Sequence, residues 1–189
     1  MRLTVGSNAP VFAADALGGR RVDLAALRGR TVLLKFYRFA TCPVCNWHMQ
    51  AFIHEYRTLE ALGLTTIVLF HSPGEKIARV RRAPAPFDIV ADPGRRIFEA
   101  YGVEKSWRAM FSPSVMWAYA HALEAGFAPG LLTSDGGITG NPADFLIGAD
   151  GRIAFAHYGR HFADALGVDQ IAEIRRGLES GSASRAIAS

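Results

Sequence analysis

Two short apolar runs, Thr31–Phe36 and Thr65–His71, stand out in the first half of the chain. Both are rich in β-branched side chains and lack polar alternation, which predicts strands that are buried on both faces. Between them, apolar residues recur at helical spacing over Pro43–Leu62, and Gly63 follows as a helix stop. The order strand, helix, strand predicts an α/β fold around a parallel sheet.

Shorter segments extend this pattern on both sides. Gly18-Gly19 lies between apolar residues of Val5–Asp23, which predicts an N-terminal β-hairpin, and the turn Gly148–Gly151 predicts a closing hairpin. The other predicted elements are a helical turn at Asp23–Leu27, a helix at Pro73–Arg82, a strand at Phe87–Val90, a helix at Gly94–Tyr101, strands at Phe145–Ile147 and Arg152–Ala156, and a helix at Asp164–Leu178.

The periodic pattern lapses over Lys105–Asn141, which holds a helical piece at Ser114–Ala125 and a Gly-rich stretch after it. The insertion is rich in Trp, Met and Phe, which predicts a substrate lid or a dimer surface; a satellite helical core is the alternative. The small, polar end Glu179–Ser189 predicts a disordered tail. We therefore expect a single domain over residues 1–178, an insertion over 105–141 and a tail over 179–189.

Composition narrows the classes of protein. The chain has 189 residues, half of them hydrophobic, which suits one domain with a full core and excludes a wholly disordered chain. The net charge of +4 is scattered, and Arg79, Arg81 and Arg82 make the single dense basic run, so no nucleic-acid partner is expected. No apolar run approaches the roughly 20 residues that span a bilayer, and Met1–Pro10 lacks signal-peptide features. These features predict a cytoplasmic protein without a membrane partner.

The candidate chemistry lies at the two cysteines, in the sequence Cys42-Pro-Val-Cys45. Proline suits the first turn of a helix, so Pro43 places Cys42 at the helix N-cap, beside unpaired N–H groups and the positive end of the helix dipole. This setting stabilises a thiolate and lowers the pKa of Cys42. Cys45 lies three residues further on the same helix face, where it can exchange a disulfide with Cys42.

Two other interpretations of the cysteine pair stay open. Zinc would need two more ligands, for which His48 and His54 are the nearest candidates, and an iron–sulfur cluster would take two ligands from a partner subunit. The chain would then be a non-enzymatic module that binds a metal or a cluster. The two cysteines can also be inert core residues. The redox interpretation requires no cofactor.

Several segments resemble the AhpC/TSA-type peroxiredoxin-like (redoxin) family of the thioredoxin-fold superfamily, in its C-P-x-C subgroup. The similarity is carried by Val5–Phe12, Leu17–Gly19, Val22–Leu24, Leu27–Gly29, Leu33–Tyr37 with the cysteine motif, and Phe145–Ile153. The resemblance covers about three-quarters of the chain and leaves out the insertion and the tail. It implies a thioredoxin-like fold with an N-terminal β-hairpin extension and a helical insertion before the last β-hairpin.

The resemblance assigns roles in two ways. The peroxiredoxin pattern F-Y-P-x-x-x-T-x-x-C, set on Phe36-Tyr37, puts Arg38 at the proline, Cys42 at the threonine and Cys45 at the peroxidatic cysteine. The thioredoxin pattern instead makes Cys42 the nucleophile. Pro142 stands where peroxiredoxins carry an arginine, three residues before the Phe of a strand. Thioredoxins have a cis proline there, facing the cysteines, so the Asn141–Pro142 bond is a candidate cis bond, with an ordinary trans turn as the alternative.

Four further side chains near this centre carry alternative interpretations. Arg38 can replace the missing arginine or be a surface cation, and Thr41 can offer its hydroxyl to a sulfur or cap the helix. His48 is a candidate thiolate partner for Cys45, but a solvent-facing histidine on the helix is the more common case. Asp144 alternates with Phe145, which predicts that it faces solvent.

The implied function is that of a thiol-based antioxidant oxidoreductase that cycles Cys42 and Cys45 between dithiol and disulfide, with a peroxide as the first substrate. In that version the Cys45 thiolate attacks the peroxide and Cys42 condenses with the sulfenic acid. The alternative is a thioredoxin-like protein disulfide reductase with Cys42 as nucleophile. The expected partners are a peroxide or a protein disulfide, a thioredoxin- or glutathione-type reductant, and a second copy in a homodimer.

Overall fold

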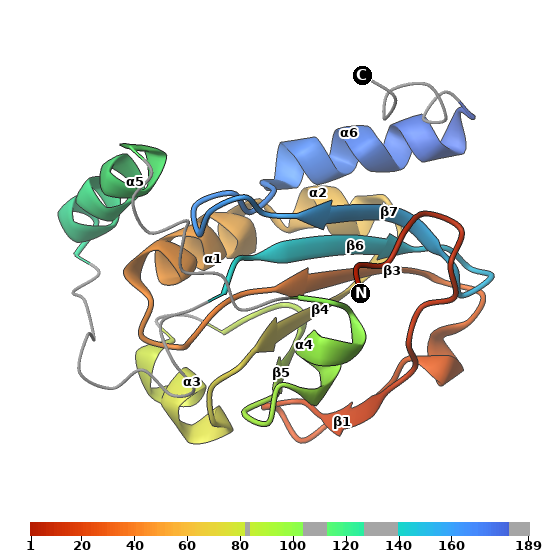
Figure 1. Cartoon of the computed structure of the whole chain (residues 1–189), viewed down its shortest axis with the longest axis horizontal. Helices are drawn as coiled ribbons and strands as arrows, with labels where there is room; N and C mark the ends of the chain where they lie inside the picture. The colour runs from red at the N-terminus through yellow and green to blue at the C-terminus, as the bar shows by residue number, and fades with distance from the viewer. Residues whose placement is uncertain (82–83, 104–112, 127–139, 182–189) are drawn as a thin grey trace.

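The computed structural model describes residues 1–81, 84–103, 113–126 and 140–181. A five-stranded sheet forms its centre in the order β5-β4-β3-β6-β7 (Figure 1). The strands are β3 (Thr31–Phe36), β4 (Leu64–Phe70), β5 (Asp88–Ala91), β6 (Ala143–Ile147) and β7 (Ile153–Tyr158). β3, β4 and β5 are parallel, whereas β6 and β7 form an antiparallel hairpin beside β3. The predicted α/β class is confirmed.

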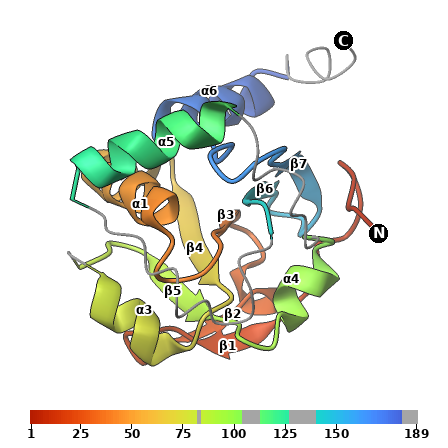
Figure 2. The same cartoon turned by 60° about the vertical axis from the view of Figure 1, so that its left-hand side comes forward.

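Helices cover one face of the sheet, and a smaller layer covers the other (Figures 1 and 2). The first group is α1 (Pro43–Glu55), α2 (Arg57–Ala61), α3 (Gly74–Val80) and α6 (Val168–Glu179). The second is the hairpin β1 (Ala13–Asp15) and β2 (Arg21–Asp23), the 3-10 turn Ala25–Leu27 and α4 (Arg96–Ala100). α5 (Pro113–Glu124) packs beside α1. None of the helices in the described ranges is long and apolar enough to cross a membrane.

β3 is buried because both of its faces are covered. Leu33 belongs to the core beneath α1 and α6, while Leu34 and Phe36 belong to the core on the side of α4. The strand therefore needs apolar residues at consecutive positions, which is the pattern that predicted it. Its carboxyl end leads directly into the cysteine segment.

Most predicted elements lie within two residues of the observed ones, with two clear differences. The helix predicted over Pro43–Leu62 is divided at Tyr56 into α1 and α2, and the last helix begins at Val168 rather than Asp164. In the 105–141 insertion, α5 is the described element, and the Gly-rich stretch lies mostly outside the described residues. Residues 182–189 of the predicted tail also lie outside them, whereas Glu179 is the last residue of α6.

Candidate active site

The cysteine pair lies where β3 passes into α1. Cys42 is the N-cap of α1, in an extended conformation (φ −69°, ψ 115°), and Pro43 begins the helix, as predicted. The Cys45 N–H donates a hydrogen bond to the Cys42 sulfur over 3.4 Å. The thiol at position 42 therefore takes the place of a capping hydroxyl or carboxylate and faces the positive end of the helix.

Cys42 is fully buried, which by itself raises the pKa of its thiol. Opposing this, a hydrogen bond from the Cys45 thiol, the positive charge of Arg38 and the N–H groups of Cys45 and Val44 stabilise the thiolate. The Arg38 Nη1 atom lies 3.6 Å from the Cys42 sulfur. Together these contacts lower the pKa of Cys42 to about 7.

The second cysteine titrates in the opposite direction. Burial, the hydrogen bond that its thiol donates to Cys42 and the negative charge of Cys42 raise the pKa of Cys45 well above its ordinary value. As the pH rises through 7 the pair therefore loses its first proton from Cys42, while Cys45 keeps its own. This asymmetry favours Cys42 over Cys45 as the thiolate of the pair.

Arg38 is buried at 2% exposure, so the prediction of a surface cation is wrong. Its guanidinium carbon lies 4.0 Å from the ring centre of Phe162, in the loop after β7, and 5.0 Å from that of Phe39. The rings hold the guanidinium against the cysteine segment, where its charge acts on Cys42 in a water-poor setting. Arg38 thus occupies the position expected of a replacement for the missing family arginine.

The segment before Cys42 is fixed by hydrogen bonds that the sequence did not reveal. The Ala40 N–H donates to Ser72 Oγ over 2.9 Å, and the Asn46 side-chain amide donates to the carbonyls of Ala40 (2.6 Å) and Cys42 (2.9 Å). Asn46 is a buried amide in the first turn of an apolar helix, which is a signal that it serves a backbone partner. These contacts hold the sulfur of Cys42 in place.

For Thr41 and for Pro142, one of the two predicted interpretations is wrong. Thr41 is half-buried beside Cys42, but the N-cap is Cys42 itself, so the capping role predicted for Thr41 is wrong. The Asn141–Pro142 bond is trans, because no cis peptide bond occurs among the described residues. Pro142 lies at the same end of the sheet as the cysteine segment, since Phe36 pairs with Ala143. There Pro142 accepts a hydrogen bond from the Gly159 N–H over 2.9 Å.

Two neighbouring side chains are more buried than predicted. Asp144 is 1% exposed and pairs with Lys35 at 2.6 Å, so its expected solvent-facing position is wrong. His48 is half-buried rather than solvated. Burial, and then the charge of Lys35, lower the pKa of His48 to about 4, so that it is neutral at pH 7 and cannot act as a cationic partner for a thiolate.

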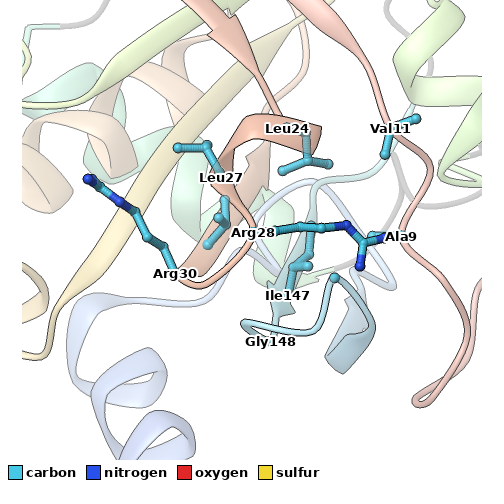
Figure 3. A pocket seen from close by; sticks show the side chains of 10 residues that line it. Ala9, Val11, Leu24, Leu27, Arg28, Arg30, Ile147 and Gly148 are labelled. Carbon is cyan, nitrogen blue, oxygen red and sulfur yellow. The ribbon is translucent and has the colours of Figure 1, made fainter.

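Within the described ranges no group of three or more His, Cys, Asp or Glu side chains is placed to hold a metal, so the zinc or cluster alternative needs donors from outside these ranges. At the opposite end of the sheet, Figure 3 shows Arg28 lying across a small hollow beside Leu24 and Ile147. Its volume of about 10 Å³ holds at most one water molecule.

Replacing Arg38 by methionine should raise the pKa of Cys42 and slow its oxidation at pH 7 about 10²-fold, since a donor aimed at the reacting centre is lost. Arg38→Lys keeps the positive charge, so its Cys42 pKa and its oxidation rate should lie between those of the wild type and of Arg38→Met. The pKa is read from the thiolate ultraviolet absorbance of the Cys45→Ser background, and far-UV circular dichroism controls for folding. An unchanged pKa in Arg38→Met would show that Arg38 does not act on Cys42.

A thiolate–thiol pair at the start of a helix, beside a buried guanidinium, defines the class of thiol oxidoreductases. The family model of the AhpC/TSA family matches residues 5–156, and the chain belongs to this family. The family match and the α/β architecture confirm the predicted thioredoxin-like, peroxiredoxin-like assignment, and the chain is a thiol-based oxidoreductase.

Individual relatives agree with this assignment. Rv2521 of Mycobacterium tuberculosis (strain H37Rv), classed among the peroxiredoxins, is 27% identical over 178 residues, which is 94% of this chain and 96% of that protein. The thiol-disulfide oxidoreductase ResA of Bacillus subtilis is 28% identical over 53% of this chain and 57% of its own length. The structure of a reduced Plasmodium vivax 2-Cys peroxiredoxin matches with a TM-score of 0.68 at 18% identity, over 94% of this chain and 83% of that one. The last similarity supports the fold.

Proposed function

We propose that the chain reduces peroxides, with Cys42 as the attacking thiolate and Cys45 as the resolving thiol. The observation that carries this proposal is the surroundings of the Cys42 sulfur. It accepts hydrogen bonds from the Arg38 guanidinium and the Cys45 N–H, and its pKa is lowered to about 7. The family pattern assigned the attack to Cys45, but the high pKa of Cys45 favours Cys42 instead.

The proposed reaction has two chemical steps before reduction. The Cys42 thiolate attacks the outer oxygen of a hydroperoxide; an S–O bond forms, the O–O bond breaks, and the leaving alkoxide takes a proton to become an alcohol, or water from hydrogen peroxide. Arg38 stabilises the negative charge that develops on the peroxide oxygens. The Cys45 sulfur then attacks the Cys42 sulfenic acid, which forms the disulfide and releases water.

Burial supports a peroxide over a protein disulfide as the first electrophile. Cys42 is 0% exposed and Cys45 is 1% exposed. A mixed disulfide with a protein needs an exposed sulfur, whereas a small peroxide needs a much narrower opening. The similarity to ResA favours the second candidate function, a disulfide reductase, in which Cys42 attacks a disulfide and Cys45 resolves the mixed disulfide.

The two candidates separate in one experiment. The fully reduced protein is mixed with hydrogen peroxide in one arm and with an oxidised small dithiol protein in the other, and oxidation is followed by tryptophan fluorescence, because Trp47 lies in the same helix as the cysteines. We expect the peroxide rate constant to exceed that of free cysteine by several orders of magnitude, and the protein disulfide to react slowly. The reverse order would establish the reductase and overturn the peroxidase.

The pH dependence follows from the pKa of Cys42. Because that pKa is about 7 and the thiolate is the reacting form, the rate of peroxide reaction should rise as the pH increases through 7 and level off about one unit above it. Stopped-flow measurements of the Cys45→Ser variant between acid and mildly alkaline pH give the profile. A rate that still climbs steeply above pH 9 would mean that the surroundings of Cys42 do not lower its pKa, and would contradict its assignment as the attacking thiolate.

The remaining partners are proposed on general grounds. The disulfide would be returned to the dithiol by a thioredoxin- or glutathione-type reductant in the cytoplasm, where reducing conditions suit a catalytic cysteine pair. A homodimer is proposed through the 105–141 insertion, because α5 exposes Met116, Trp117 and Leu123. Sedimentation of the wild type and of a Trp117→Ser variant tests this assembly.

A further inference from the structure

A cavity of about 280 Å³ lies close to the cysteine segment and has no part in the steps above. It is lined by Arg2, Val103, Asn141, Pro142, Tyr158, Gly159 and Arg160. A volume of this order is near the lower end of the range for small-molecule sites. The lining combines apolar side chains with two cationic groups, so it is suited to a small ligand that carries negative charge.

The sheet register places this cavity at the same end as Cys42. Phe36 at the end of β3 pairs with Ala143, and Ala143 pairs with Tyr158. The neighbouring residues at this end of the sheet, Tyr37, Pro142 and Gly159, therefore lie side by side. Pro142 and Gly159, both in the cavity wall, are joined by a hydrogen bond of 2.9 Å.

The loop after β7 connects the cavity to the thiolate. It carries Arg160 in the cavity wall and Phe162, whose ring packs on the Arg38 guanidinium at 4.0 Å. The same guanidinium reaches the Cys42 sulfur at 3.6 Å. Arg160 and Phe162 therefore link the cavity wall to the surroundings of Cys42 through one short loop.

The charge of the cavity is positive. The guanidinium carbon of Arg2 lies 4.9 Å from the ring centre of Tyr158, which holds it at the wall. Asp164 accepts from the backbone N–H of Arg160 over 2.8 Å and from its Nε over 3.2 Å, and thus orients that arginine. No Asp or Glu is among the described lining residues, and Asp164 pairs with Arg160 from outside that lining. Two arginines in one cavity bind carboxylates well, because each presents a planar fork of donors.

We propose that this cavity binds the carboxylate of a small thiol, which is the electron donor that reduces the Cys42–Cys45 disulfide. The inference rests on the proposed disulfide cycle, and it selects a small acidic thiol over a protein dithiol as the reductant. Burial of both cysteines agrees with this choice, since a small molecule reaches a buried disulfide more easily than a protein does.

The reduction is balanced by two thiol molecules. The thiolate of the first attacks the Cys45 sulfur; the Cys42–Cys45 bond breaks, and Cys42 leaves as a thiolate, since the thiol of lower pKa is the better leaving group. The thiolate of the second molecule attacks the sulfur of the first in the mixed disulfide. Cys45 is released and takes a proton, and the two donor molecules leave as their own disulfide.

The test starts from protein oxidised to the disulfide with diamide, so that it does not depend on the peroxide reaction. Reduction is followed by stopped flow with glutathione, which carries two carboxylates, and with glutathione diethyl ester, which carries none, at equal thiolate concentrations. We expect glutathione to react about tenfold faster with the wild type. The variants Arg2→Gln and Arg160→Gln should lose most of this preference, while Arg57→Gln, an exposed arginine on α2, should retain it.

The proposal is overturned if the ester equals glutathione in the wild type, or if the arginine variants slow both thiols equally. It is also overturned if Arg57→Gln loses the preference as the cavity variants do. A separate arm oxidises the reduced protein with a carboxylate-bearing hydroperoxide and with hydrogen peroxide. If Arg2→Gln and Arg160→Gln change that preference and leave the reduction unchanged, the cavity binds the peroxide's carboxylate and the reductant assignment is wrong.

Discussion

Replacing Cys42 by serine should lower the rate of reaction with hydrogen peroxide by at least about 10³-fold, whereas Cys45→Ser should keep the first oxidation step. The reason lies in the two pKa values. Cys42 supplies a thiolate at neutral pH because Arg38 and the helix N–H groups stabilise it. The remaining thiol of Cys42→Ser is Cys45, which loses the charge of Cys42 but stays buried, and this burial raises its pKa, so little of it is thiolate at pH 7.

The products of the two variants differ as well. Cys45→Ser lacks the resolving sulfur, so oxidation should stop at a sulfenic acid on Cys42 that dimedone traps and mass spectrometry locates. With excess peroxide this species should proceed to sulfinic acid, while the wild type should form the disulfide. Full peroxide reactivity in Cys42→Ser, with dimedone on Cys45, would contradict the assignment and restore the role that the family pattern gives to Cys45.

The position of the reactive pair could be predicted from sequence because its determinants are local. A buried strand, a short turn and a proline at the first helical position place Cys42 at an N-cap whatever the rest of the chain does. The choice of nucleophile could not be predicted in this way. It depends on Arg38, whose burial under Phe162 joins segments more than a hundred residues apart in the chain.

Asp144 shows why other parts of the site escaped prediction. The alternation of polar Asp144 with apolar Phe145 is typical of a strand with one solvent-exposed face. However, β6 is a central strand covered on both sides. The informative signal was Lys35, a charged residue within the apolar run of β3 that requires a buried counter-charge. Similarly, helical periodicity continued through Tyr56 and gave no sign of the break between α1 and α2.

Removal of either charge of the buried Lys35–Asp144 pair should strongly lower the stability of the fold. Both residues are 1% exposed, face each other across β3 and β6, and lie 2.6 Å apart. Lys35 Nζ also donates to the Leu166 carbonyl over 2.7 Å, and Asp144 Oδ2 accepts from the Leu166 N–H over 3.1 Å. Asp144→Ala leaves a buried ammonium without its counter-charge and should lower the free energy of unfolding by about 3–5 kcal/mol.

The double variant Lys35→Met/Asp144→Leu separates the cost of an unpaired charge from the value of the pair. It removes both charges and fills the space with apolar groups, so the two Leu166 backbone groups become the main loss, at about 1–3 kcal/mol. We therefore expect the double variant to be more stable than Asp144→Ala in urea unfolding. Glu179→Gln, which breaks a partly exposed pair with Arg175, should change stability by at most about 1 kcal/mol.

The same pair should influence the active site through the loop that it holds. Leu166 is anchored by Lys35 and Asp144, and four residues earlier Phe162 packs on the Arg38 guanidinium. The double variant should therefore stay folded but raise the pKa of Cys42 toward its ordinary value, because a looser loop positions Arg38 less well. A thiolate titration in the Cys45→Ser background measures this shift, and Glu179→Gln should leave the pKa of Cys42 unchanged. A folded double variant whose Cys42 still titrates near 7 would show that the pair stabilises the fold without positioning Arg38.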